Sequence, residues 1–542
     1  MTPSFDFIIV GAGSAGCALA NRLSANGRFR VLLLEAGGWD RHLLLKLPLA
    51  WGAVLINRMY DWGYDTEPEP QMDGRRIEVA RGKVIGGSSS INAMAYVRGN
   101  RADYERWASR GLPDWSYGKV LPYFRKQESW EGGASEFRGG DGPLATRKAR
   151  YQDPLVDAYL AAAQELGYAL NDDYNGDQQD GFARMQMTIR DGRRESAATG
   201  YLHPVLARTN LSVRVNCLVT RICFDGTRAI GVECIDKGEH RFISAGREVI
   251  LSGGAINSPQ LLMLSGIGDP AELSRNDIVV KAELPGVGKN LQDHVAALLI
   301  YGRRDQSPFL RHMRADRLLM ALGQGLLAGK GFATELPGGI TGFVKTNSSE
   351  AIPDIQLLFI AGSLAAKPYL PPFRQPFSDT FACRVVLLRP ESRGAITLAS
   401  ADPVAHPKIH QGLLGVDADW QKLSAGIRIF RELAQRPRLA PYVDREVGPG
   451  AAVITQSELK AYVQKTAVTA HHPCGTCRMG PTNDDEAVVD PQLRVRGVDG
   501  LRVVDASVFP DLVGGNINAP VIMIAEKAAD FILNTPAAVA GL

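Results

Sequence analysis

The sequence lacks long hydrophobic runs and lacks an excess of charge of either sign. No stretch of its 542 residues approaches the roughly 20 consecutive apolar residues that a transmembrane helix needs. Its 61 Lys and Arg residues nearly balance its 58 Asp and Glu residues, which gives a net charge of +3. A balance so close to neutral is not the pattern of a nucleic-acid or anionic-membrane binder. We therefore expect no nucleic-acid partner and at most a peripheral membrane contact.

Cysteine is also scarce. The chain has seven cysteines, an odd and scattered set that does not suit a disulfide framework. The first stretch, MTPSFDFIIVGAGSAG, has neither the basic region nor the separate apolar region of a signal peptide, and it leads directly into an apolar strand. These features favour a reducing compartment, and we expect a cytoplasmic location.

Glycine, by contrast, is abundant. The chain has 57 glycines, and its content of 45% hydrophobic and 22% charged residues is that of a soluble globular protein with many tight turns. Length alone suggests about three or four domains, because domains average roughly 100 to 200 residues.

The first 34 residues predict a strand, a glycine turn, a helix and a second strand. Residues 5–10 form an apolar, β-branched run of strand length. A G-x-G-x-x-G pattern follows at Gly11, Gly13 and Gly16, where apolar residues begin to recur at helical spacing. Residues 31–34 then form a second apolar run, so this segment has the layout of a dinucleotide-binding unit.

An acid completes this unit. Glu35 ends the second strand, nineteen residues after Gly16. Glycine lets the backbone approach a pyrophosphate whose charge is met by the helix N-terminus, and the acid accepts from a ribose hydroxyl. A carboxylate at this position repels the 2′-phosphate of NADP, but it does not distinguish NAD from FAD.

Two further glycine-rich segments lie later in the chain. Residues 81–105, RGKVIGGSSSINAMAYVRGNRADYE, contain a glycine doublet followed by three serines, and such small residues suit a backbone pressed against a flat ligand. Residues 253–268, GGAINSPQLLMLSGIG, follow an apolar run. The run is typical of a strand, and the residues after it are typical of a turn and the start of a helix.

With these segments the chain resembles the glucose-methanol-choline (GMC) oxidoreductases, a flavoprotein family that binds FAD. The likeness runs from Phe5 to about Ile532 and includes LPGVGKNLQDH and LRVVDASVFP. Within the family, the pattern is nearest to the bacterial choline dehydrogenase-like alcohol dehydrogenases. The resemblance implies an α/β fold, α+β overall, in which a substrate domain built on an antiparallel sheet is inserted into a Rossmann-like FAD-binding domain.

Both implied domains are discontinuous in sequence. The FAD-binding domain covers residues 1–155, 196–300 and 476–542, and the substrate-binding domain covers residues 156–195 and 301–475. The resemblance places adenine at the backbone of Val219 and the flavin beside a C-terminal segment. The full set of implied FAD contacts is Gly11, Gly13, Ser14, Ala15, Gly16, Glu35, Ala36, Arg81, Gly82, Gly86, Gly87, Ser88, Ser89, Asn92, Ala93, Met94, Ala95, Val219, Asp505, Ala506, Asn516, Asn518 and Ala519.

The expected mode of FAD attachment follows from one position at which this sequence departs from the family pattern. In some family members a histidine just before the counterpart of Asn92 is bonded covalently to FAD. Ile91 occupies that place here, so we expect non-covalent, dissociable FAD.

The stretch HHPCGTCRMG, residues 471–480, admits three chemistries. Zinc could use Cys474 and Cys477 with His471 or His472, but the H-x-E motif that accompanies such cysteines in zinc deaminases is missing. A reactive dithiol of the thioredoxin type would need its own βαβ unit, whereas a helix running into a loop precedes the motif. We therefore expect no metal and favour buried cysteines without a redox role.

The third chemistry is acid/base catalysis by His472. Pro473 keeps the preceding residue out of the helical region, so His472 can project from a fixed loop. In the resembling family this histidine faces the flavin, and its partner is a histidine or asparagine that we align with Asn516. Asn518 is the neighbour that a two-residue shift would select. We assign His471 to the substrate site together with His472, although it could serve only for packing.

The implied reaction is oxidation of a primary alcohol to an aldehyde. FAD accepts the hydride at N5. His472, with an ordinary pKa of about 6.5, is suited to take the hydroxyl proton near neutral pH. Asn516 would hold the same oxygen and stabilise the developing alkoxide.

The electron acceptor and the alcohol stay open. Oxygen, a quinone or another carrier would each complete the cycle, and an alcohol oxidase of the pyridoxine or aryl-alcohol type is the alternative. A hydroxynitrile lyase that keeps FAD without redox turnover is a weaker one. Choline would need an aromatic or acidic cage for its ammonium, and we find none among Trp51, Trp62 and Tyr64.

Overall fold

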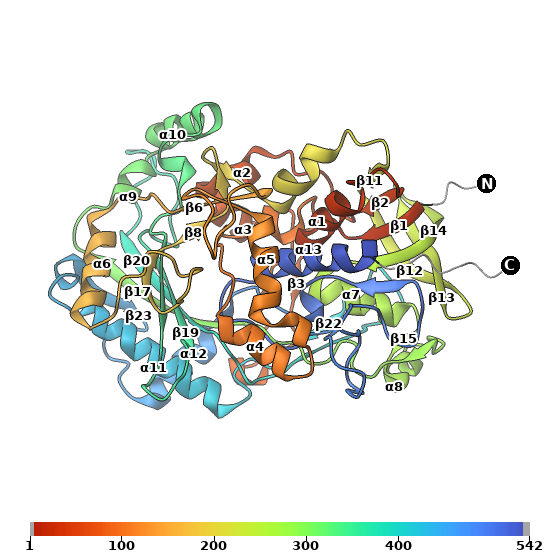
Figure 1. Ribbon diagram of the computed structural model, residues 1–542. Helices are drawn as coiled ribbons and strands as arrows, with labels where there is room; N and C mark the ends of the chain where they lie inside the picture. Colours follow the sequence, from red (N-terminus) through yellow and green to blue (C-terminus); the bar gives the residue numbers. More distant parts are fainter. Residues whose placement is uncertain (1–4, 535–542) are drawn as a thin grey trace.

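Two seven-stranded β-sheets organise the chain in the computed structural model, which describes residues 5–534. Figure 1 shows the first sheet at the end of the molecule that carries β1 and β14, and the second at the opposite end beside α11. The strands of the first sheet are β1 (Phe5–Val10), β2 (Val31–Leu34), β11 (Leu211–Arg214), β12 (Cys217–Asp225), β13 (Arg228–Asp236), β14 (Glu239–Leu251) and β25 (Leu501–Val503).

The first sheet has the order β11-β2-β1-β14-β13-β12, with β25 beside β14. Strands β11, β2, β1, β14 and β25 are parallel, whereas β12, β13 and the start of β14 form an antiparallel meander. The residues of β2 are all buried, as expected for a parallel strand covered on both faces.

Helices from distant parts of the chain cover this sheet. Helix α13 packs against α1 and α5, and α7 packs against β12. Their bounds are α1 (Ser14–Leu23), α5 (Tyr117–Gln127), α7 (Gly254–Leu264) and α13 (Asn518–Asn534). The β1–α1–β2 unit is the βαβ unit predicted from the first residues of the sequence.

The second sheet is antiparallel and has the order β23-β17-β20-β19-β18-β7, with β24 beside β17. Its strands are β7 (Gly181–Arg184), β17 (Val295–Arg303), β18 (Ile340–Val344), β19 (Ile355–Ile360), β20 (Thr380–Leu387), β23 (Val443–Gly448) and β24 (Val468–Thr469). One face, which includes Leu357, Cys383 and Val385, packs into a hydrophobic cluster that also contains residues of α6 (Pro154–Glu165), α11 (Asp417–Ala434) and α12 (Gln456–Thr466). Alternation leaves the other face free to line a site.

The remaining strands lie outside the two seven-stranded sheets, and the remaining helices range from α2, with 4 residues, to α10, with 14. The helices are α2 (Leu43–Lys46), α3 (Trp51–Ile56), α4 (Arg101–Ser109), α8 (Pro270–Arg275), α9 (Pro308–His312) and α10 (Ala315–Ala328). The strands are β3 (Tyr64–Asp65), β4 (Glu78–Val79), β5 (Glu128–Trp130), β6 (Leu144–Lys148), β8 (Gln186–Met187), β9 (Ile189–Arg190), β10 (Arg193–Arg194), β15 (Ile267–Gly268), β16 (Ala282–Glu283), β21 (Ala395–Thr397) and β22 (Lys408–His410). Across residues 5–534, no helix has both the length and the apolar character that a membrane crossing requires.

The predicted fold class is confirmed, since a Rossmann-like parallel sheet and a separate antiparallel sheet share one chain. The division into domains stays our proposal, and β17 lies across its boundary at residue 300.

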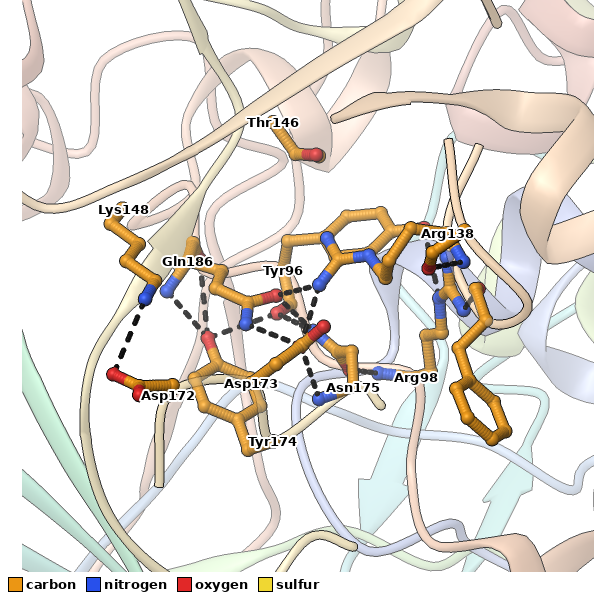
Figure 2. Close-up of polar contacts among 12 residues, drawn as sticks. Tyr96, Arg98, Arg138, Thr146, Lys148, Asp172, Asp173, Tyr174, Asn175 and Gln186 are labelled. Carbon is orange, nitrogen blue, oxygen red and sulfur yellow. Dashed lines mark hydrogen bonds and ion pairs between the residues drawn. The ribbon is translucent and has the colours of Figure 1, made fainter. Parts of the chain in front are cut away.

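A buried charged network forms around Glu128, at the start of β5. Both of its oxygens accept from Arg138, and Oε2 also accepts from Arg98 at 2.6 Å. Arg138 continues the network to Asp173 and Gln186, each at 2.7 Å, as Figure 2 shows. The side chains of Glu128, Arg98 and Arg138 are 0–2% exposed, so two guanidinium groups share one carboxylate away from solvent.

Candidate active site

A cavity of about 460 Å³ is lined by residues of both sheets. Val10, Leu34 and Leu251, at the ends of parallel strands β1, β2 and β14, line one side. Leu358 of β19 and Arg384 of β20 line another. The carboxyl ends of parallel strands are where open α/β sheets bind ligands.

The turn after β1 is built to let an anion approach the N-terminus of α1. Gly11 has a φ of +100°, and a Cβ there would lie 2.5 Å from the carbonyl oxygen of Ser252. Gly13 is the N-cap of α1, so no side chain covers the first amides of the helix. These amides carry the positive end of the helix dipole and form an anion site of the kind a pyrophosphate needs.

Glu35 closes this end of the cavity. Its Oε2 accepts from the amide of Ala12 at 2.9 Å, and its Oε1 accepts from the amide of Gly37 at 2.8 Å. Burial raises the pKa of Glu35 to about 7, although the two amides oppose that shift. Each carboxylate oxygen keeps a further lone pair, so ribose hydroxyls can still donate to it.

The second glycine segment folds into a tight loop against this turn. A Cβ on Gly82 would lie 2.3 Å from the backbone of Gly87, and a Cβ on Gly87 would lie 2.7 Å from Cα of Gly13. The hydroxyl of Ser88 accepts from the amide of Gly82 at 3.1 Å. Only residues without a Cβ allow the two glycine segments to meet in this way.

The C-terminal segment closes the cavity from the other side. Asp505 accepts from the amide of Gly254 at 2.8 Å and from the hydroxyl of Ser258 at 2.6 Å. Asn518, the first residue of α13, accepts from the hydroxyl of Ser14 at 2.7 Å. Asn518 is therefore tied to the N-terminus of α1.

These features fit FAD: a glycine cradle at a helix N-terminus, an acid with free lone pairs, and a cavity lined by residues of both sheets. The predicted FAD residues line this cavity, except Gly16, Gly86 and Ala519. Gly16 serves the close approach of α1 to the turn, because a Cβ there would lie 1.9 Å from the carbonyl oxygen of Gly11.

His472 lies in the loop after β24 and is held on both sides of its ring. Its Nδ1 lies 2.9 Å from Nδ1 of His294, and its Nε2 lies 3.1 Å from Nδ2 of Asn516. Its backbone amide donates to Asp293 at 2.8 Å. The structure thus brings the two predicted catalytic residues together, and it adds His294 and Asp293 to them.

The hydrogen-bond partners fix the tautomer of His472. His294 Nε2 lies 2.9 Å from the carbonyl oxygen of Leu388, which can only accept, so His294 carries its proton on Nε2. Its Nδ1 is then the acceptor for Nδ1–H of His472. This leaves His472 Nε2 as a lone pair in contact with the Asn516 amide and the cavity. A lone pair so placed is what a general base requires.

Burial keeps this histidine pair neutral. It lowers the pKa of His294 to about 4, and burial together with the nearby His294 and Arg81 holds the pKa of His472 well below its ordinary value. The pKa of His472 thus lies below the ordinary value of about 6.5 from which its role as a base was predicted. A lowered pKa means that His472 is already in its basic form at neutral pH.

Asn516 is oriented by a glutamine of the second sheet. Nε2 of Gln356, on β19, reaches Oδ1 of Asn516 at 3.5 Å and the hydroxyl of Thr341 at 3.1 Å. Asn516 therefore turns its NH₂ group toward His472. An alcohol oxygen at the lone pair of His472 would also lie within reach of this NH₂ donor.

His471 lines the cavity in a left-handed backbone conformation, with φ of +63°. Its Nδ1 accepts from the amide of Ala80 at 3.3 Å, and its carbonyl oxygen accepts from Arg81. Burial, with help from the charges of Arg81 and Arg384, lowers the pKa of His471 to about 3. His471 is thus a neutral neighbour of the site, which leaves its predicted contact with substrate a prediction.

Cys474 and Cys477 are fully buried in the hydrophobic cluster of the first sheet. Burial raises the pKa of both thiols well above its ordinary value, so neither supplies a thiolate. Within residues 5–534, no group of three or more His, Cys, Asp and Glu side chains is arranged to hold a metal ion.

Sequence reasoning missed His294, Gln356 and Arg384. His294 lies in NLQDH, a segment that carried the family resemblance but to which we assigned no role. Nothing in the sequence marks Gln356 or Arg384, because their place in the site depends on the register of the second sheet.

Comparisons with known proteins agree with this geometry. Two models of the GMC oxidoreductase family match the chain, one over residues 5–296 and the other over residues 390–525. The mitochondrial choline dehydrogenase of Homo sapiens is 45% identical over 98% of this chain and 90% of its own length. The oxygen-dependent choline dehydrogenase of Photobacterium profundum is 40% identical over 99% of this chain and 94% of its own length.

Solved structures are similar over the same extent. Pyridoxine 4-oxidase from Mesorbium loti matches with a TM-score of 0.87 and 30% identity, over 98% of this chain and 99% of that one. Formate oxidase from Aspergillus oryzae matches with a TM-score of 0.90 and 28% identity, over 98% of both chains.

Proposed function

Because this chain belongs to the GMC oxidoreductase family, we propose that His472 is the general base of an FAD-dependent alcohol oxidation and that Asn516 holds the reacting oxygen. The protein is an FAD-dependent oxidoreductase that acts on CH–OH donors, as its choline dehydrogenase and alcohol oxidase relatives indicate. The observation that carries the proposal is the lone pair on His472 Nε2, which lies 3.1 Å from the Asn516 amide in the cavity.

The proposed mechanism uses three side chains of the protein in sequence. His294 fixes the proton of His472 on Nδ1, so Nε2 can accept the hydroxyl proton of a primary alcohol. Asn516 donates to the same oxygen while negative charge develops on it. Bound FAD supplies the hydride acceptor. Loss of the proton and the hydride turns the alcohol into an aldehyde.

We also propose that FAD is held without a covalent bond. Ile91 lines the cavity at the position where some relatives carry a bonded histidine, and its aliphatic side chain has no atom that could form such a bond. Acid precipitation should release the flavin into the supernatant. Flavin retained on the precipitated chain would contradict this part of the proposal.

The central test is anaerobic bleaching of bound FAD by a panel of primary alcohols, including polyols, aryl alcohols, pyridoxine and choline. His472→Ala should lower the bleaching rate by about a hundred- to ten-thousand-fold, the usual worth of a positioned base. His240→Ala is the matched control, because His240 is an exposed histidine on β14, and it should keep the wild-type rate. Near-normal bleaching by His472→Ala would overturn the assignment.

Two further outcomes of the same experiment are informative. Rapid reoxidation on admission of air indicates an oxidase, whereas slow reoxidation indicates that a quinone or another carrier is the acceptor. A yellow protein that no alcohol bleaches would favour a lyase without redox turnover.

A further inference from the structure

Arg384 is a cation that faces the cavity without a partner. It lies on β20, a central strand of the second sheet, where its neighbours in register are Leu298 of β17 and Leu358 of β19. Cys383 and Val385 point into the hydrophobic cluster on the opposite face, so alternation turns Arg384 toward the cavity that it lines.

The other basic side chains of the cavity are engaged. Arg81 donates to the carbonyl oxygens of Ala80 and His471. Lys83 lies over the ring of Trp62, 4.5 Å from its centroid. Among the residues that the structure describes, Arg384 is the cavity-lining Lys or Arg for which no hydrogen bond, ion pair or ring contact is found.

No acid of the cavity neutralises Arg384. The carboxylates that line the cavity belong to Glu35 and Asp505, and both accept from backbone amides on the FAD side. The acid whose charge reaches Arg384 is Glu78, which forms no ion pair with Arg384 and lies 3.8 Å from Arg58 instead. Burial lowers the pKa of Arg384, but a guanidinium stays charged at neutral pH.

Arg384 lies on the same sheet face as Gln356, the residue that orients Asn516. In register, Leu358 is opposite Arg384, and Gln356, which contacts Asn516, is the next residue along the same face. Diagonal neighbours of this kind lie about 7–8 Å apart in an antiparallel sheet. A small molecule whose hydroxyl contacts Asn516 and His472 could therefore extend a second group to Arg384.

We propose that Arg384 binds a carboxylate on the substrate, so that the preferred donors are primary alcohols that also carry a carboxylate. A guanidinium presents paired donors that match a carboxylate in geometry as well as charge. A quaternary ammonium such as choline would meet a like charge, and Lys83 already lies over the ring of Trp62 that could have formed part of an aromatic cage. This inference rests on the proposed function of His472.

The first test measures binding without turnover. Benzoate, benzamide and benzyltrimethylammonium are titrated into the FAD-loaded protein, and the absorbance of bound FAD is recorded. Wild-type protein should bind benzoate most tightly and the cation least tightly. Arg384→Met should weaken benzoate by about tenfold to a hundredfold, the usual worth of a hydrogen bond to a charged group, and leave benzamide unchanged.

Two further variants sharpen this test. Arg384→Lys keeps the charge and should recover part of the benzoate affinity. Glu78→Gln removes the opposing acid and should tighten benzoate binding. The FAD content of each variant, from the flavin-to-protein absorbance ratio, checks that the cavity is intact. Equal binding of benzoate and benzamide by wild-type protein, or tighter binding of the cation, would overturn the proposal.

A turnover experiment distinguishes the proposed carboxylate site from the proposed function of His472. Para-hydroxymethyl benzoate should bleach the flavin at lower concentration than para-hydroxymethyl benzamide. If neither alcohol bleaches FAD but benzoate binding still depends on Arg384, the proposed function fails and the carboxylate site stands. If both bleach equally, with a requirement for His472 but none for Arg384, the carboxylate site fails and the proposed function stands.

Discussion

The molecule contains two buried polar clusters, and they differ in how many of their polar groups have hydrogen-bond or ion-pair partners within the protein. Around Glu128, both carboxylate oxygens accept from guanidinium groups, and Oε1 also accepts from Thr146 at 2.8 Å. Around His472, one ring nitrogen is satisfied by His294, whereas the lone pair of the other meets only the Asn516 amide, at 3.1 Å, beside the cavity that His472 lines. Arg384 nearby has no partner among the described residues.

This difference separates structural from functional polar groups. A buried charge costs free energy unless hydrogen bonds and opposite charges compensate it, and the Glu128 network supplies both. At the cavity wall, the lone pair of His472 meets a single neutral donor, Asn516, and the cation of Arg384 has no counter-charge, so a bound substrate can supply further partners to both. Buried groups that await a partner are therefore the better guide to the reaction.

The largest expected effect is a loss of stability when the network around Glu128 is broken. Glu128→Gln removes the charge that two buried guanidinium groups share, so the free energy of unfolding should fall by about 3–5 kcal/mol. Urea titration of the FAD-loaded protein, followed by tryptophan fluorescence, measures this change. The bleaching rate per bound FAD should stay at its wild-type value, because Glu128 is not among the residues that line the cavity.

The matched control is Glu131→Gln. Glu131 follows the same strand but is exposed, and its carboxylate pairs with Arg150 at the surface. Surface pairs of this kind contribute about 0–1 kcal/mol, so its loss should cost no more than that. Equal costs for the two variants would show that burial does not distinguish the Glu128 network.

The second expected effect is of intermediate size and concerns the cluster around His472. His294→Leu removes the acceptor for Nδ1–H of His472 and leaves that donor buried and unsatisfied. The bleaching rate should fall by about tenfold to a hundredfold, the equivalent of 1–3 kcal/mol. His294→Asn, whose side-chain oxygen can accept at a similar position, should recover part of the rate.

The pH profile tests whether His294 acts through His472. The lowered pKa keeps His472 in its basic form, so the wild-type bleaching rate should fall only at a pH below the ordinary histidine pKa of about 6.5, when His472 becomes protonated. His294 helps to lower that pKa, so His294→Leu should move the fall to higher pH. A rate loss without any shift of the profile would point to a purely structural role.

The sequence predicted the parts of this site that are local in the chain. The strands over residues 5–10 and 31–34 are observed with those bounds, since apolar runs and a glycine turn determine them. His472 and Asn516 were aligned from family motifs, and the structure brings their side chains into contact. The alignment chose Asn516 over Asn518, and that contact supports the choice.

The site residues that the sequence did not predict depend on pairings between segments that are distant in the chain. His294 and His472 are 178 positions apart, and Arg384 faces the cavity only because β20 adopts one of two possible registers. A shift of one residue would exchange Arg384 for Cys383 on the cavity face. No local pattern in the sequence reports such a choice, because the apolar run of β20 is compatible with either face.

The smallest effect on the bleaching rate is expected at the cysteines that lie close to His472 in sequence. Cys474 and Cys477 are fully buried, and the raised pKa of their thiols leaves no thiolate for redox chemistry. Replacement of both by alanine should leave the bleaching rate per bound FAD unchanged, although loss of buried volume should lower stability by about 0.5–3 kcal/mol per site. Cys383→Ala, in the hydrophobic cluster of the second sheet, is the matched control and should behave alike. A loss of bleaching confined to the Cys474 and Cys477 variant, at normal FAD content, would restore the dithiol hypothesis. The site would then contain a redox-active thiol pair in addition to the base His472 and the cation Arg384.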